Sequence, residues 1–151
     1  MQKDFLQYAD SMGLESEFHA SVERCAQMFR QMTGIAAASI LLTPAKDFLG
    51  NNCFELWLFS DHAMMNGGIL AKSARDKSLE VVALHYVLSV KLASKHYDMA
   101  AYPEVDSDER SELTFQCRIR DHEKPLVITA SGTNCKHLQE IVIRHFTRNM
   151  R

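Results

Sequence analysis

The chain contains seven histidines, which could serve in catalysis or metal binding because imidazole titrates near neutral pH and ligates metals. No two of them stand four residues apart, the spacing at which a helix presents a histidine pair to zinc. His145 adjoins Phe146 within an apolar helical stripe, where a hydrogen-bonded structural role is expected. The sequence therefore predicts no metal and no cofactor. The full set is His19, His62, His85, His96, His122, His137 and His145.

The motifs of nucleophilic and phosphate chemistry are also missing from the sequence. Ser131-Gly132 lacks the Gly-x-Ser-x-Gly frame of a nucleophile elbow. Gly67-Gly68 is followed by Ile69-Leu70 and not by the Lys-Ser/Thr of a phosphate-binding loop. We therefore expect a protein that is not an enzyme. A small α+β enzyme stays open as an alternative, because catalytic groups are recognised by their geometry and not by chain order.

Four cysteines are widely spaced and form no Cys-x-x-Cys pair: Cys25, Cys53, Cys117 and Cys135. Structural zinc ligands usually come in closely spaced pairs, so this spacing argues against a zinc site. Each cysteine stands among apolar neighbours, which is typical of small core residues in a reducing compartment.

Four basic residues are the candidate ligand-binding set. Lys46 follows the first predicted strand, and Lys72, Arg75 and Lys77 follow the third. Cations gathered on one rim attract an anionic membrane, and each contributes on the order of 1 kcal/mol. A solvated loop is the alternative interpretation, because runs of charge are usually solvated.

Length and composition limit the class of protein. With 151 residues the chain fits one domain, and 46% apolar and 24% charged residues are typical of a soluble globular protein. A net charge of −2 gives no reason to expect nucleic acid as a partner. The longest apolar run, Ile35 to Leu42, is too short to cross a membrane, and the N-terminus is not an apolar signal. We expect a cytoplasmic protein, or a fragment of one, with peripheral membrane association as an alternative.

Hydrophobic periodicity predicts two helices before a β-rich region and one helix after it. The second helix carries an apolar stripe at spacings of three and four and stops before Gly34; the stripe consists of Phe18, Val22, Cys25, Phe29 and Met32. Pro44 is expected to end the first strand, because proline cannot donate to a ladder. Residues 93–111 are expected to form a long loop. The expected helices are 4–11, 18–32 and one from about 134, and the strands are 37–43, 54–59, 62–67, 79–84, 87–92, 112–120 and 126–130.

The segment from Phe54 to Gly67 is the clearest hairpin signal. Apolar residues flank a Ser60-Asp61 pair on both sides, and Ser and Asp side chains bond turn backbone. Gly67-Gly68 is expected to close the second strand of this hairpin.

The order of these elements resembles that of pleckstrin-homology (PH) domains, most closely those of Dbl-type Rho guanine-nucleotide exchange factors. The same family is resembled by the local sequence Phe54-Glu55-Leu56-Trp57-Leu58-Phe59-Ser60-Asp61. Residues 113–116, 126–131 and the final helix are similar to that family's sixth strand, seventh strand and C-terminal helix. The resemblance covers about residues 37–150. It implies a mainly β, α+β fold, in which a seven-stranded bent antiparallel barrel or sandwich is closed by a C-terminal helix. The implied domains are an N-terminal helical extension, 1–34, and a PH-like domain, 35–151.

The sequence departs from that family in two places. Leu138 stands near the start of the final helix, where the family usually carries a tryptophan, and the single tryptophan is Trp57. Members that bind phosphoinositides tightly place cations at the end of the first strand and in the second. Here Lys46 stands beside Asp47, and Glu55 lies in the second strand.

The resemblance therefore implies a non-catalytic recognition or targeting module of a signalling protein. It would bind a protein partner and, weakly, an anionic membrane. If the chain is a piece of an exchange factor, the implied partner is a Rho-type small GTPase. A phosphoinositide-binding peripheral membrane module is the alternative.

Overall fold

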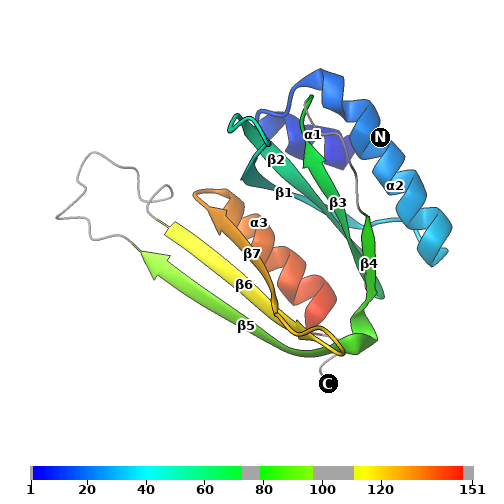
Figure 1. Ribbon diagram of the computed structural model, residues 1–151, viewed down its shortest axis with the longest axis vertical. Helices are drawn as coiled ribbons and strands as arrows, with labels where there is room; N and C mark the ends of the chain where they lie inside the picture. Colours follow the sequence, from blue (N-terminus) through cyan, green and yellow to red (C-terminus); the bar gives the residue numbers. More distant parts are fainter. Residues whose placement is uncertain (1, 73–78, 97–110, 148–151) are drawn as a thin grey trace. The chain divides into compact units, whose positions relative to one another are not determined.

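The chain divides into two compact units, residues 1–83 and 84–151, in a computed structural model that describes residues 2–72, 79–96 and 111–147. Figure 1 shows one antiparallel sheet and its helices in each unit. The first unit contains α1 (Lys3–Ser11), the 3-10 turn η1 (Ser16–Phe18), α2 (His19–Thr33), β1 (Ser39–Lys46), β2 (Asn52–Phe59), β3 (Ala63–Leu70) and β4 (Glu80–Ala83). The second contains η2 (Leu84–Tyr86), β5 (Val87–His96), β6 (Ser111–Ile119), β7 (Leu126–Ser131), α3 (Asn134–Ile141) and the π-helical turn η3 (Val142–Phe146).

Helices α1 and α2 cover one face of the four-stranded sheet of the first unit (Figure 1). The predicted stripe on α2 is confirmed at Val22, Cys25 and Phe29, which are buried in a core shared with β1, β2 and β3, but its last residue, Met32, is 57% exposed. Gly34 ends α2 in the left-handed conformation with φ of 79°, and its N–H bonds the Arg30 carbonyl. Glycine takes this conformation without steric cost, so the predicted stop is also confirmed.

Strand β1 runs through Pro44 to Lys46, so the expectation that Pro44 ends the strand was wrong. The sheet order is β1-β2-β3-β4, and β1 is therefore an edge strand. The backbone N–H of Leu42 donates to the Tyr8 hydroxyl at 3.0 Å, so the even-numbered donors of β1 point away from β2. Pro44 shares that side, where no ladder bond is lost, and an edge strand tolerates proline there.

The predicted hairpin is present as β2 and β3. The Ser60 hydroxyl accepts the backbone N–H groups of His62 and Ala63, at 3.2 and 3.1 Å, as expected of serine at a turn. Gly67 and Gly68 do not close β3, which continues to Leu70. They lie where the β2–β3 register shifts, and Gly68 has φ of 82°. The glycine pair therefore forms a β-bulge within β3 and does not end the strand.

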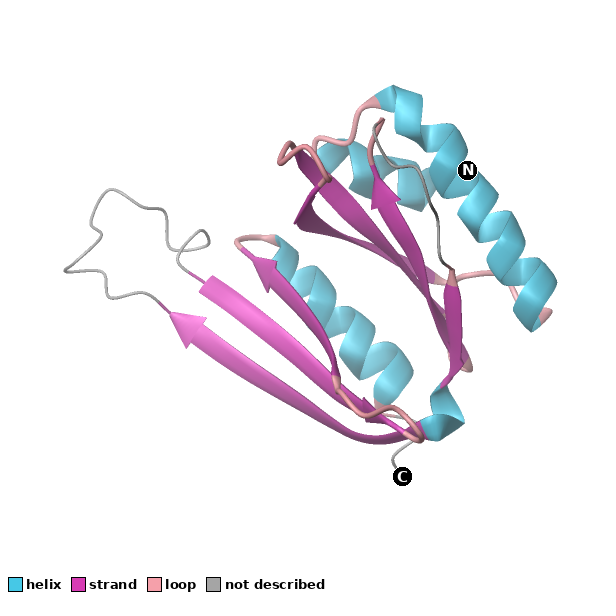
Figure 2. Cartoon of the chain, viewed as in Figure 1, coloured by secondary structure: helices cyan, strands magenta, loops and turns pink. Residues whose placement is uncertain are grey.

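In the second unit, α3 packs against β6 and β7 of the sheet β5-β6-β7 (Figure 2). The predicted stripe of the C-terminal helix is confirmed, since Leu138, Ile141, Val142 and Phe146 are all buried. On the sheet, Phe115 is fully buried, and its ring lies 4.7 Å from that of Phe146 at an angle of 58°. This cluster is the core of the second unit.

The described strands form two separate sheets, one of four strands and one of three, and they do not form a closed barrel. The expected α+β, mainly β class with a C-terminal helix is confirmed.

The predicted boundary between residues 34 and 35 falls inside the first compact unit. A division of the chain into compact units does not test a domain boundary that was inferred from a family resemblance. The boundary at residues 34 and 35 therefore stays a prediction. The expected loop at 93–111 is wrong at its start, because β5 reaches His96, and its remainder, 97–110, lies outside the described residues.

Cys117 on β6 gives a prediction for alkaline stability. Burial raises the pKa of its thiol to about 11, from an ordinary value of 9.0. The folded state then holds a proton that the unfolded chain has lost, so stability is full below pH 9.0 and falls as the pH rises toward 11. We expect a decrease of roughly 1–3 kcal/mol in the free energy of unfolding over that range. Urea titrations at each pH measure it. Cys117→Ala should flatten the slope, whereas an unchanged slope in that variant would assign it to other groups.

Candidate functional site

An open groove in the first unit is the candidate site, and we call it the loop groove. Its volume is about 380 Å³. The β1–β2 connection forms one wall, the link from α1 to η1 another, and the end of β3 the third. The lining residues are 13–15, Phe18, Asp47, Leu49, 51–54 and 70–72. Leu14 and Leu70 are buried beneath it, so the floor is apolar and the rim is polar.

Asp47 fixes the shape of the β1–β2 connection. Its Oδ1 accepts the backbone N–H groups of Leu49 and Asn51, at 2.9 and 2.8 Å. The backbone closes the same turn, because the Asp47 N–H donates to the Asn51 carbonyl and the Gly50 N–H donates to the Asp47 carbonyl. An aspartate that bonds backbone two and four residues ahead holds a loop in one conformation.

This ordered loop presents two large apolar side chains to solvent. Phe48 and Leu49 are each 65% exposed, more than any other large hydrophobic residue that the structure describes. Adjacent exposed apolar residues beside a groove are a feature of interaction sites, whereas single ones are ordinary. The loop groove therefore combines an apolar floor with an apolar tip.

Lys72 lies on the groove rim and forms an ion pair there. Its Nζ is 3.2 Å from Glu17 Oε1. The hydrogen bond that the Lys72 ammonium donates to the Glu17 carboxylate raises the pKa of Lys72. A hydrogen bond between the Glu15 and Glu17 carboxyl groups, which requires a proton on Glu15, raises the pKa of Glu15 and lowers that of Glu17. The rim is thus a mixed-charge cluster in which two carboxylates share one ammonium.

The predicted basic set is brought together only in part. Lys46 ends β1 and bonds the Asn52 side chain, and Lys72 follows β3. Because β1 and β3 both run antiparallel to β2, their ends lie at the same end of the sheet. Both lysines already have a partner. Arg75 and Lys77 lie outside the described residues.

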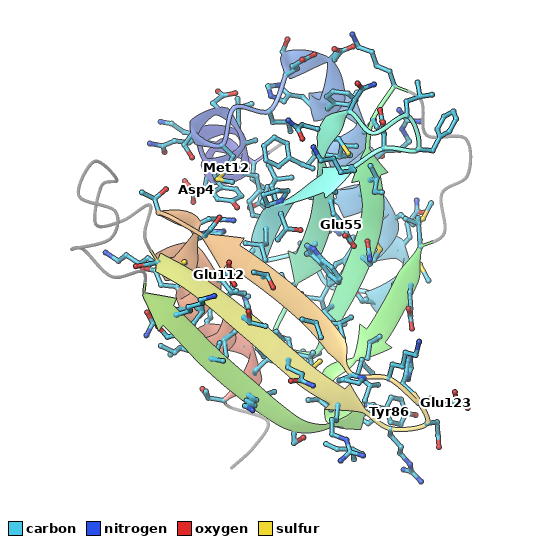
Figure 3. All side chains as sticks on the ribbon, turned by 60° about the vertical axis from the view of Figure 1, so that its left-hand side comes forward. Asp4, Met12, Glu55, Tyr86, Glu112 and Glu123 are labelled. Atoms are coloured by element: carbon cyan, nitrogen blue, oxygen red, sulfur yellow. The ribbon has the colours of Figure 1, made fainter. Side chains whose placement is uncertain are left out.

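Glu55 lies on β2, where Figure 3 labels it. Its Oε1 accepts the Asn66 side-chain amide at 2.7 Å. This carboxylate is therefore held in the sheet beside a neutral partner.

The described histidines, cysteines and acids form no group of three or more that could hold a metal. His145 is fully buried, as expected of a structural residue. All four cysteines are free thiols, and only Cys25 and Cys117 are buried. Burial raises the pKa of the Cys53 thiol in the groove wall, which disfavours the thiolate form that a nucleophile needs.

The sequence interpretation missed most of the loop groove. Glu15, Glu17, Phe48 and Leu49 were not among the predicted residues. The available signal was the pair Phe48-Leu49, which is apolar within a turn-rich segment from Asp47 to Asn52. The contribution of residues 13–18 had no comparable signal, because they meet the loop only in the folded unit.

Among the helices that the structure describes, none combines the length and the apolar character needed to cross a membrane.

Comparisons with known proteins returned no match: no family model, no curated protein and no solved structure is similar enough to the chain to be reported.

Proposed function

We propose that this protein is a non-catalytic recognition module that binds a protein partner through the loop groove. The observation that carries the proposal is the groove itself, with an apolar floor and with Phe48 and Leu49 exposed beside it. Large apolar side chains that anchor in pockets supply most of the binding energy in protein interfaces. A charged rim around an apolar centre is also the usual arrangement of such interfaces.

The charges of the rim favour a protein over an inositol phospholipid. Among the described residues at the rim, Glu15, Glu17 and Asp47 supply three carboxylates, against the two cations Lys46 and Lys72. Tight phosphate binding needs cations that are free to donate charge-assisted bonds. Here Lys72 is paired with Glu17, and Lys46 is bonded to Asn52. A partner that brings an apolar anchor beside a basic residue suits this rim better.

We further propose that the fold is PH-like. Two antiparallel sheets of four and three strands in chain order, followed by a C-terminal helix, support this, together with the resemblance of residues 54–61. If the chain is part of an exchange factor, a Rho-type small GTPase is the partner class to test first. Exchange activity itself would belong mostly to the catalytic helical domain of such a factor.

The test compares Leu49→Glu with Met32→Ser. Met32 is 57% exposed on α2 of the same unit and serves as the matched surface control. Calorimetry with a panel of Rho-type GTPases should show binding that Leu49→Glu weakens by at least about tenfold, the cost of losing one interface anchor. Met32→Ser should leave the affinity unchanged. Equal losses of affinity in both variants would contradict the assignment of the binding site to the loop groove. If no GTPase of the panel binds, Rho-type GTPases are excluded as the partner class.

Co-sedimentation with vesicles separates the alternatives. Neutral, phosphatidylserine and mixed phosphoinositide vesicles are compared at low and physiological salt. We expect no head-group-selective binding, because the described rim residues include more carboxylates than cations. Selective binding that survives physiological salt would overturn the protein-recognition proposal in favour of the phosphoinositide alternative.

A further inference from the structure

Strand β5 of the second unit is an exposed sheet edge. The sheet order β5-β6-β7 gives β5 one neighbouring strand within the described residues, and this strand is ten residues long. Leu88 is 59% exposed and Leu92 is 41% exposed. Natural proteins usually shorten, cover or interrupt edge strands because an open edge pairs with other chains.

The hydrogen-bond register shows which backbone groups of β5 face outward. The Gly132 N–H donates to the Ser111 carbonyl, so the odd-numbered residues of β6 bond β7 and the even-numbered ones bond β5. Their partners on β5 include Lys91 and Ala93. The N–H and C=O groups of Val90 and Leu92 therefore point to the side without a described strand.

The two faces of β5 differ in chemistry. On the inner face, Val90 and Leu92 lie opposite Cys117 and Phe115, which are buried. Helix α3 packs on β6 and β7, and an open groove of about 530 Å³ is lined by Leu92, Leu113 and the start of α3. Lys91 is exposed and, being opposite Gln116, points to the outer face.

We propose that β5 binds an extended segment of another protein by strand addition, and that this segment alternates acidic and apolar residues. Its backbone would pair with Val90 and Leu92, its apolar side chains would cover the inner-face groove, and its acidic ones would stand opposite Lys91. This surface is additional to the loop groove and does not depend on it.

Charge selects this occupant over a second copy of the chain. Lys91, Lys95 and Arg118 all point to the outer face, which Glu112 shares opposite Lys95, so the outer face of these two strands carries three cations and one carboxylate. Antiparallel pairing of β5 with itself would double these cations on one face, and like charges across strands are destabilising. The described residues of this unit carry seven Lys and Arg against four Asp and Glu, so the wider surface also favours an acidic partner.

The test uses the full chain and a short fluorescein-labelled peptide of alternating Glu and Val, followed by fluorescence polarisation. We expect saturable, salt-sensitive binding. Lys91→Glu should weaken it about tenfold, because an attractive cross-strand pair becomes a repulsive one. A peptide of alternating Lys and Val should gain affinity for Lys91→Glu relative to the unmodified chain. Equal binding of the Glu and Lys peptides would overturn the charge assignment.

Leu92→Pro tests the backbone pairing. This substitution removes an outward donor and leaves the donors toward β6 in place, as Pro44 does in β1. Circular dichroism checks that the variant is folded, and Leu92→Val is the control that keeps the donor. We expect Leu92→Pro to abolish binding and Leu92→Val to retain it. A Glu-Val peptide with a central proline should also fail to bind the unmodified chain. Binding that survives both prolines, or no binding up to about 1 mM protein, would overturn strand addition.

Discussion

Replacing Phe29 with alanine is expected to lower the free energy of unfolding by about 3–5 kcal/mol, the usual cost of emptying a buried aromatic site. Phe29 is fully buried where α2 packs on the sheet of the first unit. The cavity would lie between elements from both sides of the predicted boundary at residue 34. The experiment therefore also tests whether the N-terminal helices are part of the core or only an extension of it.

Urea denaturation followed by circular dichroism measures the loss. Met32→Ala is the matched control on the same helix, because Met32 is 57% exposed, and it should change stability by less than about 0.5 kcal/mol. A loss below about 1 kcal/mol in Phe29→Ala would mean that α2 is a peripheral element. Removal of residues 1–34 should then leave a folded protein, whereas we expect that truncation to expose the core and unfold the first unit.

Phe115→Ala should have a similar effect on the second unit, again about 3–5 kcal/mol. Phe115 is fully buried and contacts the ring of Phe146 at 4.7 Å between centroids. The loss combines the cavity with the aromatic pair, and such a pair adds about 0.5–1.5 kcal/mol beyond its buried area.

Two further variants separate these contributions. Phe146→Leu keeps most of the apolar volume and removes the ring pair, so we expect a smaller loss of about 1–2 kcal/mol. Leu88→Ala, at a residue that is 59% exposed on β5, should be nearly neutral. If Phe146→Leu proved as costly as Phe115→Ala, packing around η3 and not the ring pair would dominate the core of the second unit.

Sequence patterns predicted the elements whose residues interact locally. The spacing of Val22, Cys25 and Phe29 locates the buried face of α2, and Gly34 locates its end. Ser60 closes the β2–β3 turn with its own hydroxyl. In each case the deciding interaction lies within a few residues, so one sequence contains the information.

Features that depend on distant partners were predicted poorly. Whether Pro44 ends a strand depends on which side of β1 lacks a neighbour, and the sheet order decides that. The role of Gly67 and Gly68 depends on the shifted register with β2. A Cβ on Gly67 would lie 3.0 Å from Leu56 Cδ2 and 3.3 Å from Cys25 Sγ, a closeness that no local pattern reports.

The candidate site shows the same limit. Of the two predicted basic residues that the structure describes, Lys72 lines the loop groove and Lys46 does not, because the other walls come from residues 13–18 and 47–54, far from Lys72 in the chain. The search for basic residues in the sequence identified one residue of the rim, Lys72. The apolar tip and the acidic partners of the rim depend on how the α1–η1 link meets the β1–β2 loop. The family resemblance and the function derived from it stay predictions, and the binding experiments above test them.

Pro44 also bears on how the protein behaves in concentrated solution. The growth of β-rich fibres requires successive outward N–H groups that a new chain can engage. Along the outer side of β1, the Leu42 donor is taken by Tyr8 and the next position is a proline. Two consecutive sites of attachment are thereby removed from this edge. Replacing Pro44 with a β-branched residue would restore one of them, and we expect the turbidity of a concentrated solution to rise relative to that of the unmodified chain.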